Sequence, residues 1–153
     1  MSGEVQGVDE LRANLAAMKI KFGNDIAGAL VKGGRIVQSA TIKSIQKREG
    51  AGRTVIRKHK GQKAYTHIAS LEGQAPNSDT GELVRGIQME VKEDDVFVGV
   101  EKSQDGKALG LEFGTTDGRL KPHPFLYPAL EKNRDKINNL VFDAIRKEVV
   151  NNG

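Results

Sequence analysis

The stretch Gly110–Leu130 decides how the second half of this chain folds. It reads Gly-Leu-Glu-Phe-Gly-Thr at 110–115 and, after a short loop, His-Pro-Phe-Leu-Tyr-Pro-Ala-Leu at 123–130. Proline fixes its own φ and lacks a backbone donor, so Pro124 and Pro128 suit the first turn of a helix. Apolar residues then recur at spacings of three and four. This pattern predicts an amphipathic C-terminal helix over about 124–150.

The residues between the two motifs read as a helix end followed by a loop. The run 107–113 is compatible with a helix, and Gly114 follows it as a stop, because a left-handed conformation is cheap only for glycine. The loop Thr115–His123 has turn-forming residues and no apolar run. We expect this loop to be exposed, and either mobile or ordered by a neighbouring molecule.

Four motifs in a fixed order carry a family resemblance. They are Thr80-Gly81-Glu82-Leu83, Val98-Gly99-Val100, Leu111-Glu112-Phe113-Gly114-Thr115 and Pro124-Phe125-Leu126-Tyr127-Pro128-Ala129-Leu130. Their order and spacing resemble the tail-completion or neck proteins of long-tailed bacteriophages, which include tail components likened to the minor tail protein Z of lambdoid phages. The resemblance covers roughly residues 8–149, and the last two motifs are its specific part. Members often have a tyrosine where this chain has Lys107.

The resemblance implies a structural virion protein of a tailed phage or prophage. Such a minor tail or neck component completes the tail and assists head-tail joining, and is found in the host cytoplasm during assembly and in the virion afterwards. Its implied partners are copies of itself in a ring, for which a hexamer would match the tail tube, and other tail and head-tail connector proteins. The motif residues carried over as structural are Thr80, Gly81, Leu83, Glu112, Phe113, Gly114, Thr115, Pro124, Phe125, Leu126, Pro128 and Ala129.

Composition bounds what the chain can build. Its 153 residues predict a single domain over 1–153, and the 5% aromatic content without tryptophan predicts a mainly aliphatic core. The 29% charged content and the mean hydropathy of −0.47 predict a lean core, which fits either a subunit completed by neighbours or an extended small domain. The absence of cysteine excludes disulfides and thiolate zinc sites. No apolar run is long enough for a membrane span, and the first nine residues do not form a secretory signal.

The first third of the chain predicts a long helix. Small and apolar residues step by three or four from Val8 to Ser44, which is about ten turns. Four glycines, at 23, 28, 33 and 34, fall inside the pattern, and each costs up to about 1 kcal/mol relative to alanine in a helix. Either Gly28 and Gly33 let another backbone approach, or Gly33-Gly34 makes a bend, or tertiary packing simply outweighs the propensity of these residues.

The segment Lys43–Lys63 concentrates the positive charge. It holds eight lysines and arginines against one glutamate, a net charge of +7, whereas the rest has 16 basic and 19 acidic residues and a net charge of −3. Strand-like residues at 53–59 and 64–70, with a turn at 60–63, predict a hairpin over about residues 50–70, which we call the basic hairpin. The residues assigned to contact with DNA or a partner are Arg53, Arg57, Lys58, Lys60 and Lys63.

The basic hairpin allows three interpretations. The first is contact with nucleic acid, because clustered cations neutralise phosphates and release counterions. The second is contact with an acidic surface of a partner protein. The third is a solvated arm without a partner. Only Tyr65 is available for stacking on bases, so we expect non-specific rather than base-specific contact with phage DNA. The alternative function for the whole chain is therefore a small basic nucleic-acid-binding module. Further subunit contacts are expected at the loop 114–122 and on the outer face of the N-terminal helix.

The middle of the chain predicts a loop and a second hairpin. Residues 71–79 are rich in turn formers, and Asp79 and Glu82 have the spacing of a reciprocal helix cap. Residues 87–91 and 96–101 alternate between apolar and polar side chains around an acidic turn at 93–95. Together these elements predict an α+β fold in which the N-terminal and C-terminal helices pack on a small antiparallel sheet made of hairpins.

No catalytic motif fits its required spacing. Gly106-Lys107 lacks the earlier glycine and the following hydroxyl of a phosphate-binding loop. The three histidines, His59, His67 and His123, have no paired ligand spacing, and the acidic pair at 94–95 is typical of a solvated turn. We therefore expect no enzyme activity, no cofactor and no metal site.

Overall fold

The computed structural model describes residues 8–47 and 52–151 and, within the first helix, chiefly the side chains from residue 23 onward. It confirms the α+β class, with two long helices and two small antiparallel hairpins. In chain order the elements are α1 (Val8–Gln46), β1 (Thr54–Arg57), β2 (Tyr65–Ile68), α2 (Glu82–Gly86), β3 (Ile87–Lys92), β4 (Asp95–Val100), a 3-10 turn (Lys102–Gln104), α3 (Asp105–Phe113) and α4 (Leu126–Asn151).

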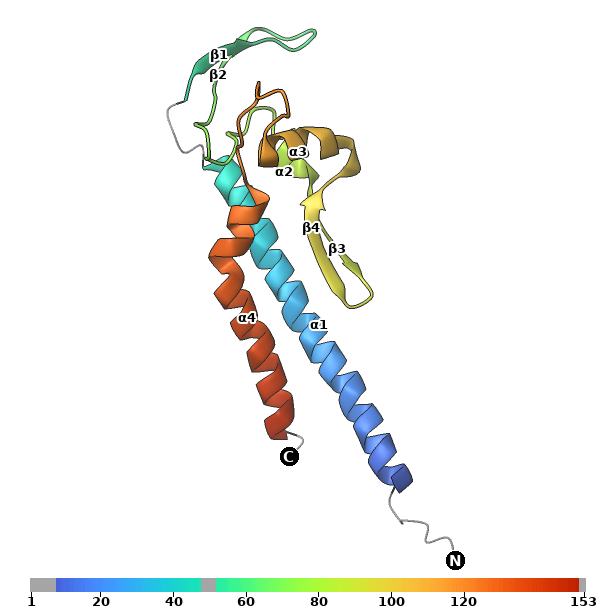
Figure 1. Cartoon of the computed structure of the whole chain (residues 1–153). Coiled ribbons are helices and arrows are strands. Elements are labelled where there is room, and N and C mark those ends of the chain that lie inside the picture. The colour runs from blue at the N-terminus through green and yellow to red at the C-terminus, as the bar shows by residue number, and fades with distance from the viewer. Residues whose placement is uncertain (1–7, 48–51, 152–153) are drawn as a thin grey trace, which may run out of the picture.

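Two antiparallel helices form the long axis of the molecule. The 39-residue α1 and the 26-residue α4 lie side by side along most of the length of α4 (Figure 1). The hairpin β3–β4 lies against α1, and the short helices α2 and α3 sit near the C-terminal end of α1 (Figure 1). The basic hairpin, formed by β1 and β2, projects at that same end.

The glycines of α1 are accommodated in one unbroken helix, so of the alternatives left open by the sequence a break at Gly33-Gly34 is not the one observed. A Cβ on Gly33 would lie 2.9 Å from the Ile137 Cγ2, and one on Gly34 would lie 2.5 Å from the Val96 Cγ1. Close approach is therefore the role of these two positions, but the approaching atoms belong to side chains and not to another backbone. At Gly28 nothing within the described chain lies within 4 Å of an added Cβ, so this position receives no close approach inside the subunit.

Each hairpin is a separate two-stranded sheet. In the first, Thr54 pairs with Ile68 and Arg57 pairs with Tyr65, so the strands are shorter than predicted and a longer loop joins them. In the second, Ile87 pairs with Val100 and a two-residue turn follows Lys92. The two hairpins do not join into one sheet, and α4 packs mainly along α1.

The core is small and mainly aliphatic. Five buried side chains form its centre, and they come from α1, α2, β3, α3 and the segment just before α4. They are Ile45, Leu83, Ile87, Ala108 and Phe125. Large apolar side chains remain exposed elsewhere, among them Ile56, Leu109, Phe113 and Phe142. The described helices include none that is long and apolar enough to cross a membrane.

Two local predictions are wrong in detail. The C-terminal helix begins at Leu126 and not at about Pro124, because Phe125 is drawn into the core ahead of the first helical turn. The reciprocal cap of α2 does not form, since α2 begins after Gly81 with no side-chain cap. The Asp79 carboxylate is instead occupied by the basic hairpin, to which Tyr65 donates a hydrogen bond of 2.6 Å.

Candidate functional site

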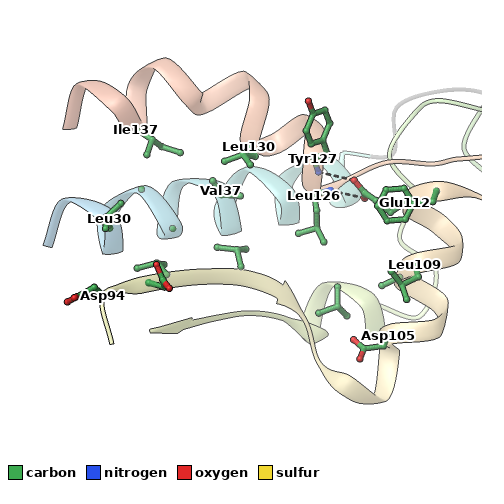
Figure 2. A pocket seen from close by; sticks show the side chains of 18 residues that line it. Leu30, Val37, Asp94, Asp105, Leu109, Glu112, Leu126, Tyr127, Leu130 and Ile137 are labelled. Carbon is green, nitrogen blue, oxygen red and sulfur yellow. Dashed lines mark hydrogen bonds between the residues drawn. The ribbon is translucent and has the colours of Figure 1, made fainter. Parts of the chain in front are cut away.

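The carboxylate of Glu112 connects the two most specific sequence motifs. Glu112 lies in the last turn of α3 and is only 8% exposed. Its Oε2 accepts hydrogen bonds from the backbone N–H groups of Phe125 at 2.9 Å and Leu126 at 3.1 Å, and its Oε1 accepts one from Tyr127 at 2.9 Å (Figure 2). We call this arrangement, Glu112 with the backbone of 125–127, the Glu112 clamp.

The clamp completes the N-terminus of α4. The first N–H groups of a helix have no partner within the helix, and the helix dipole favours a negative charge beside them. One buried carboxylate takes three of these donors, and Pro128, next in the chain, has no N–H to be satisfied. The Leu-Glu-Phe-Gly-Thr and Pro-Phe-Leu-Tyr-Pro-Ala-Leu motifs are therefore two halves of one structural device.

The loop between the two halves is held by its own hydrogen bonds. Gly114 has φ 79°, and a Cβ there would lie 2.9 Å from the carbonyl oxygen of Leu120. The Thr115 N–H donates to that same carbonyl at 2.9 Å, and the Leu120 N–H donates to the Thr115 hydroxyl oxygen at 3.0 Å. At the far end, the His123 N–H donates to the Leu111 carbonyl at 2.6 Å. The loop is exposed as predicted, but it needs no neighbouring molecule to take this form.

Asp117 contributes to the same loop. The Thr115 hydroxyl donates to its carboxylate at 2.6 Å, and the Arg119 N–H donates to it at 3.1 Å. The hydrogen bond from Thr115, followed by that from the Arg119 backbone, holds the pKa of Asp117 below its ordinary value. The carboxylate therefore stays ionised and braces the turn.

The remaining motif residues are divided between the core and the surface. Leu83 lies in the same core cluster as Phe125, which is 1% exposed, and Ala129 is buried as well. Gly81 has φ 77° at the start of α2, and the hydroxyl of the exposed Thr80 lies 3.4 Å from the Glu82 N–H. The structure thus brings Leu83, Glu112 and the start of α4 together, while Thr80 and Gly81 shape the entry to α2.

A groove lined by apolar side chains opens beside the clamp. It has a volume of about 630 Å³ and lies between α1, α4, α3 and the hairpin β3–β4. Figure 2 shows Leu126 pointing into it from α4. We call it the apolar groove, and its apolar lining includes Leu30, Val37, Val96, Leu109, Phe113, Leu126, Leu130 and Ile137.

The rim of the apolar groove is acidic. Asp94 and Asp95 lie at the turn of β3–β4 and Asp105 starts α3, and no lysine or arginine is among the lining residues. Sequence reasoning assigned Asp94-Asp95 to a solvated turn and did not find the groove. Leu109 and Phe113 lie one helical turn apart on α3, but only the structure shows that both are exposed and line the groove.

The basic hairpin is fastened to the rest of the chain through Asp79. The Arg57 Nε lies 3.2 Å from the Asp79 Oδ2, the Tyr65 hydroxyl donates to Oδ1 at 2.6 Å, and the His67 Nδ1 lies 3.6 Å from that oxygen. Tyr65 also shares a hydrogen bond of 2.8 Å with the His59 ring, on which it stacks. Arg57, predicted to contact DNA or a partner, is therefore engaged within the chain.

The contacts of Asp79 shift its own pKa and that of Tyr65. Burial raises the pKa of Asp79, but the hydrogen bond from Tyr65 and the charges of His67 and Arg57 outweigh it, so the pKa of this carboxyl lies below its ordinary value. The same hydrogen bond to Asp79, with a smaller contribution from burial, raises the pKa of Tyr65. The other predicted contact residues, Arg53, Lys58, Lys60 and Lys63, are exposed and form no ion pair with a described residue.

One arrangement resembles part of a catalytic dyad. The Ser70 hydroxyl and the His123 Nδ1 are 2.9 Å apart beside a small pocket of about 180 Å³. Over residues 8–47 and 52–151, however, no carboxylate is hydrogen-bonded to the His123 ring in the way that orients the base of a triad. Within the same ranges, no group of three or more histidine, cysteine or acidic side chains could hold a metal ion.

No protein-family model, curated protein or solved structure matches the chain.

Proposed function

We propose that this chain is a structural virion protein of a tailed phage or prophage, a minor tail or neck component that completes the tail and assists head-tail joining. The observation that carries the proposal is the Glu112 clamp. In this clamp the residues of the two specific motifs contact each other. They hold α3 and α4 together and do not form a reaction centre. Such a protein acts by assembly, in the host cytoplasm and then in the virion.

The surface supports a role in assembly. Large apolar side chains are exposed on the basic hairpin, on α3 and on α4, as Ile56, Leu109 and Phe142 illustrate. Water makes such exposure unfavourable, and exposed apolar patches commonly mark interaction sites. A subunit whose apolar surface is covered by neighbours in a ring accounts for this pattern.

The direct test removes the gene from the phage or prophage that encodes the chain. Electron microscopy of the resulting particles should show tailless heads beside finished tails, and the wild-type gene supplied in trans should restore joined particles. Normal virions in the deletion strain would overturn the proposal.

A second candidate function is non-specific binding of nucleic acid. It is favoured by the described part of the basic hairpin, residues 52–70, which contains no acidic residue and carries four cations without an ion-pair partner in the described chain. Replacing Arg53, Lys58, Lys60 and Lys63 by glutamine should then weaken duplex DNA binding and flatten its salt dependence, by about 0.9 in log-log slope for each phosphate that is no longer neutralised. An unchanged slope would remove this candidate.

A further inference from the structure

We propose that the basic hairpin of one copy of this chain docks into the apolar groove of a neighbouring copy. The proposal deepens the proposed function, because it names the contact through which subunits of a ring would associate. It rests on two surfaces of one chain that are complementary in both polarity and charge.

The groove is the receiving surface. Its walls are the apolar side chains of two long helices and the hairpin β3–β4, and Leu109 stays 59% exposed at its edge. Around this apolar floor stand the carboxylates of Asp94, Asp95 and Asp105, with no basic residue in the lining. An occupant therefore needs apolar side chains for the floor and positive charges for the rim. Nucleic acid has the wrong charge for this rim.

The basic hairpin offers that combination. In its register Thr54 pairs with Ile68 and Ile56 pairs with Thr66, so Ile56 and Ile68 lie on the same face of the ribbon. This face is turned away from the Asp79 contacts, and its isoleucines are 80% and 50% exposed. An apolar face on a two-stranded ribbon is poorly stabilised unless something packs against it.

The cations of the basic hairpin are complementary in charge to the acidic rim of the apolar groove. Lys58, Lys60 and Lys63 are exposed in the loop that follows β1, and they form no ion pair with a described residue. Of the five basic residues in the described hairpin segment, only Arg57 has an ion-pair partner among the described residues, so most of the positive charge of the hairpin is not offset. Complementary charge of this kind steers partners together and selects their register.

The arrangement of the chain favours a neighbouring copy over the hairpin of the same chain. The basic hairpin projects beyond the C-terminal end of α1 (Figure 1). The groove is lined on α1 by residues from Leu30 to Val37, two turns or more before that end. A contact between two different surfaces of identical subunits is heterologous, and it generates a ring when its rotation closes. This is the geometry that a neck ring requires.

Cysteine cross-linking tests the contact directly, because the chain has no cysteine of its own. The Ile56→Cys variant is mixed with the Leu109→Cys variant or with the Phe142→Cys variant, and each mixture is treated with a short thiol-to-thiol cross-linker. Phe142 is the matched control, since it is 60% exposed on α4 and does not line the groove. We expect several-fold more cross-linked heterodimer with Leu109→Cys. Equal yields, or more product with the control, would overturn the docking.

A charge exchange tests the same contact without cross-linking. Replacing Lys58 and Lys60 by glutamate should weaken self-association, measured by sedimentation, by about tenfold or more. Adding Asp94→Lys and Asp95→Lys to the same chain should restore it. Circular dichroism should show that all variants stay folded. Failure of the second pair to restore association would contradict the proposal, and so would a wild-type chain that stays monomeric at every concentration tested.

The two proposals fail in different ways. Rings or joined particles that assemble without the Ile56–Leu109 cross-link would leave the neck role standing and discard this interface. Normal virions after gene deletion, together with efficient cross-linking of the purified chain, would keep the interface and discard the neck role.

Discussion

Replacing Glu112 by alanine should destabilise the protein by about 3 kcal/mol. The Phe125 N–H lies at a residue that is 1% exposed, so it loses its only acceptor in a buried place, at a cost of about 1–3 kcal/mol. The N–H groups of Leu126 and Tyr127 are nearer to water, and losing their acceptor resembles the loss of a helix cap, about 0.5–2 kcal/mol. Glu112→Gln keeps one acceptor oxygen but loses the charge beside the helix dipole, so we expect about 1–2 kcal/mol.

Urea unfolding followed by circular dichroism measures these differences. With a slope of about 1.5–2 kcal/mol per molar urea, a loss of 3 kcal/mol lowers the midpoint by about 1.5–2 M. Glu72→Ala is the matched control, because Glu72 is an exposed loop glutamate and should shift the midpoint very little. If Glu112→Ala unfolds within about 1 kcal/mol of this control, the argument that the carboxylate holds the start of α4 is refuted.

Three further predictions use the backbone and the pH. Gly28→Ala should raise the free energy of unfolding by about 0.5–1 kcal/mol, because the added Cβ meets nothing. Gly34→Ala should lower it by about 1–3 kcal/mol, because the added Cβ meets side chains of β3–β4. Thermal unfolding of both variants checks these opposite signs. Gly114→Ala should cost about 3 kcal/mol and Gly118→Ala only about 1 kcal/mol, since both have positive φ but only the first has no room, and equal midpoints in urea would contradict this. The pKa of Asp79 is lower in the folded state than its ordinary value of 3.8, so the stability that its charge contributes is present above that value and is lost as the pH falls below it. The Asp79→Asn variant should therefore lose less stability than the wild type between pH 5 and pH 3, as measured by urea unfolding.

The elements that could be predicted from the sequence are those with strong local periodicity. The stripe that starts at Val8 and the spacing after Pro128 gave both long helices, because a 3.6-residue repeat is visible without tertiary information. The alternation around residues 87–100 gave the second hairpin for the same reason. Boundaries were less predictable: Phe125 lies outside α4 because the core holds it there, and no local pattern reports that.

The contacts that organise the site were not predictable from local patterns. Glu112 accepts N–H groups 13 to 15 residues away, and the only hint was its place one turn after Ala108 on the face of α3 that is buried. Asp79 has the spacing of a helix cap, but its carboxylate contacts Tyr65 and Arg57 instead. These partners are brought to Asp79 by the tertiary fold, which a local sequence pattern does not report. The apolar groove depends on four elements packing together, so it has no signature in any one of them.

The Glu112 clamp also has a consequence for the order of folding. It closes a loop of only about 13 residues, and short loops cost little chain entropy to close, so α3 and the first turn of α4 can associate before the distant helix α1 is in place. We expect contacts with so short a loop to be present in the transition state for folding. The Glu112→Ala change should therefore act mainly by slowing refolding, with a smaller effect on the rate of unfolding. The two motifs would then serve as a nucleus from which the rest of the chain is organised.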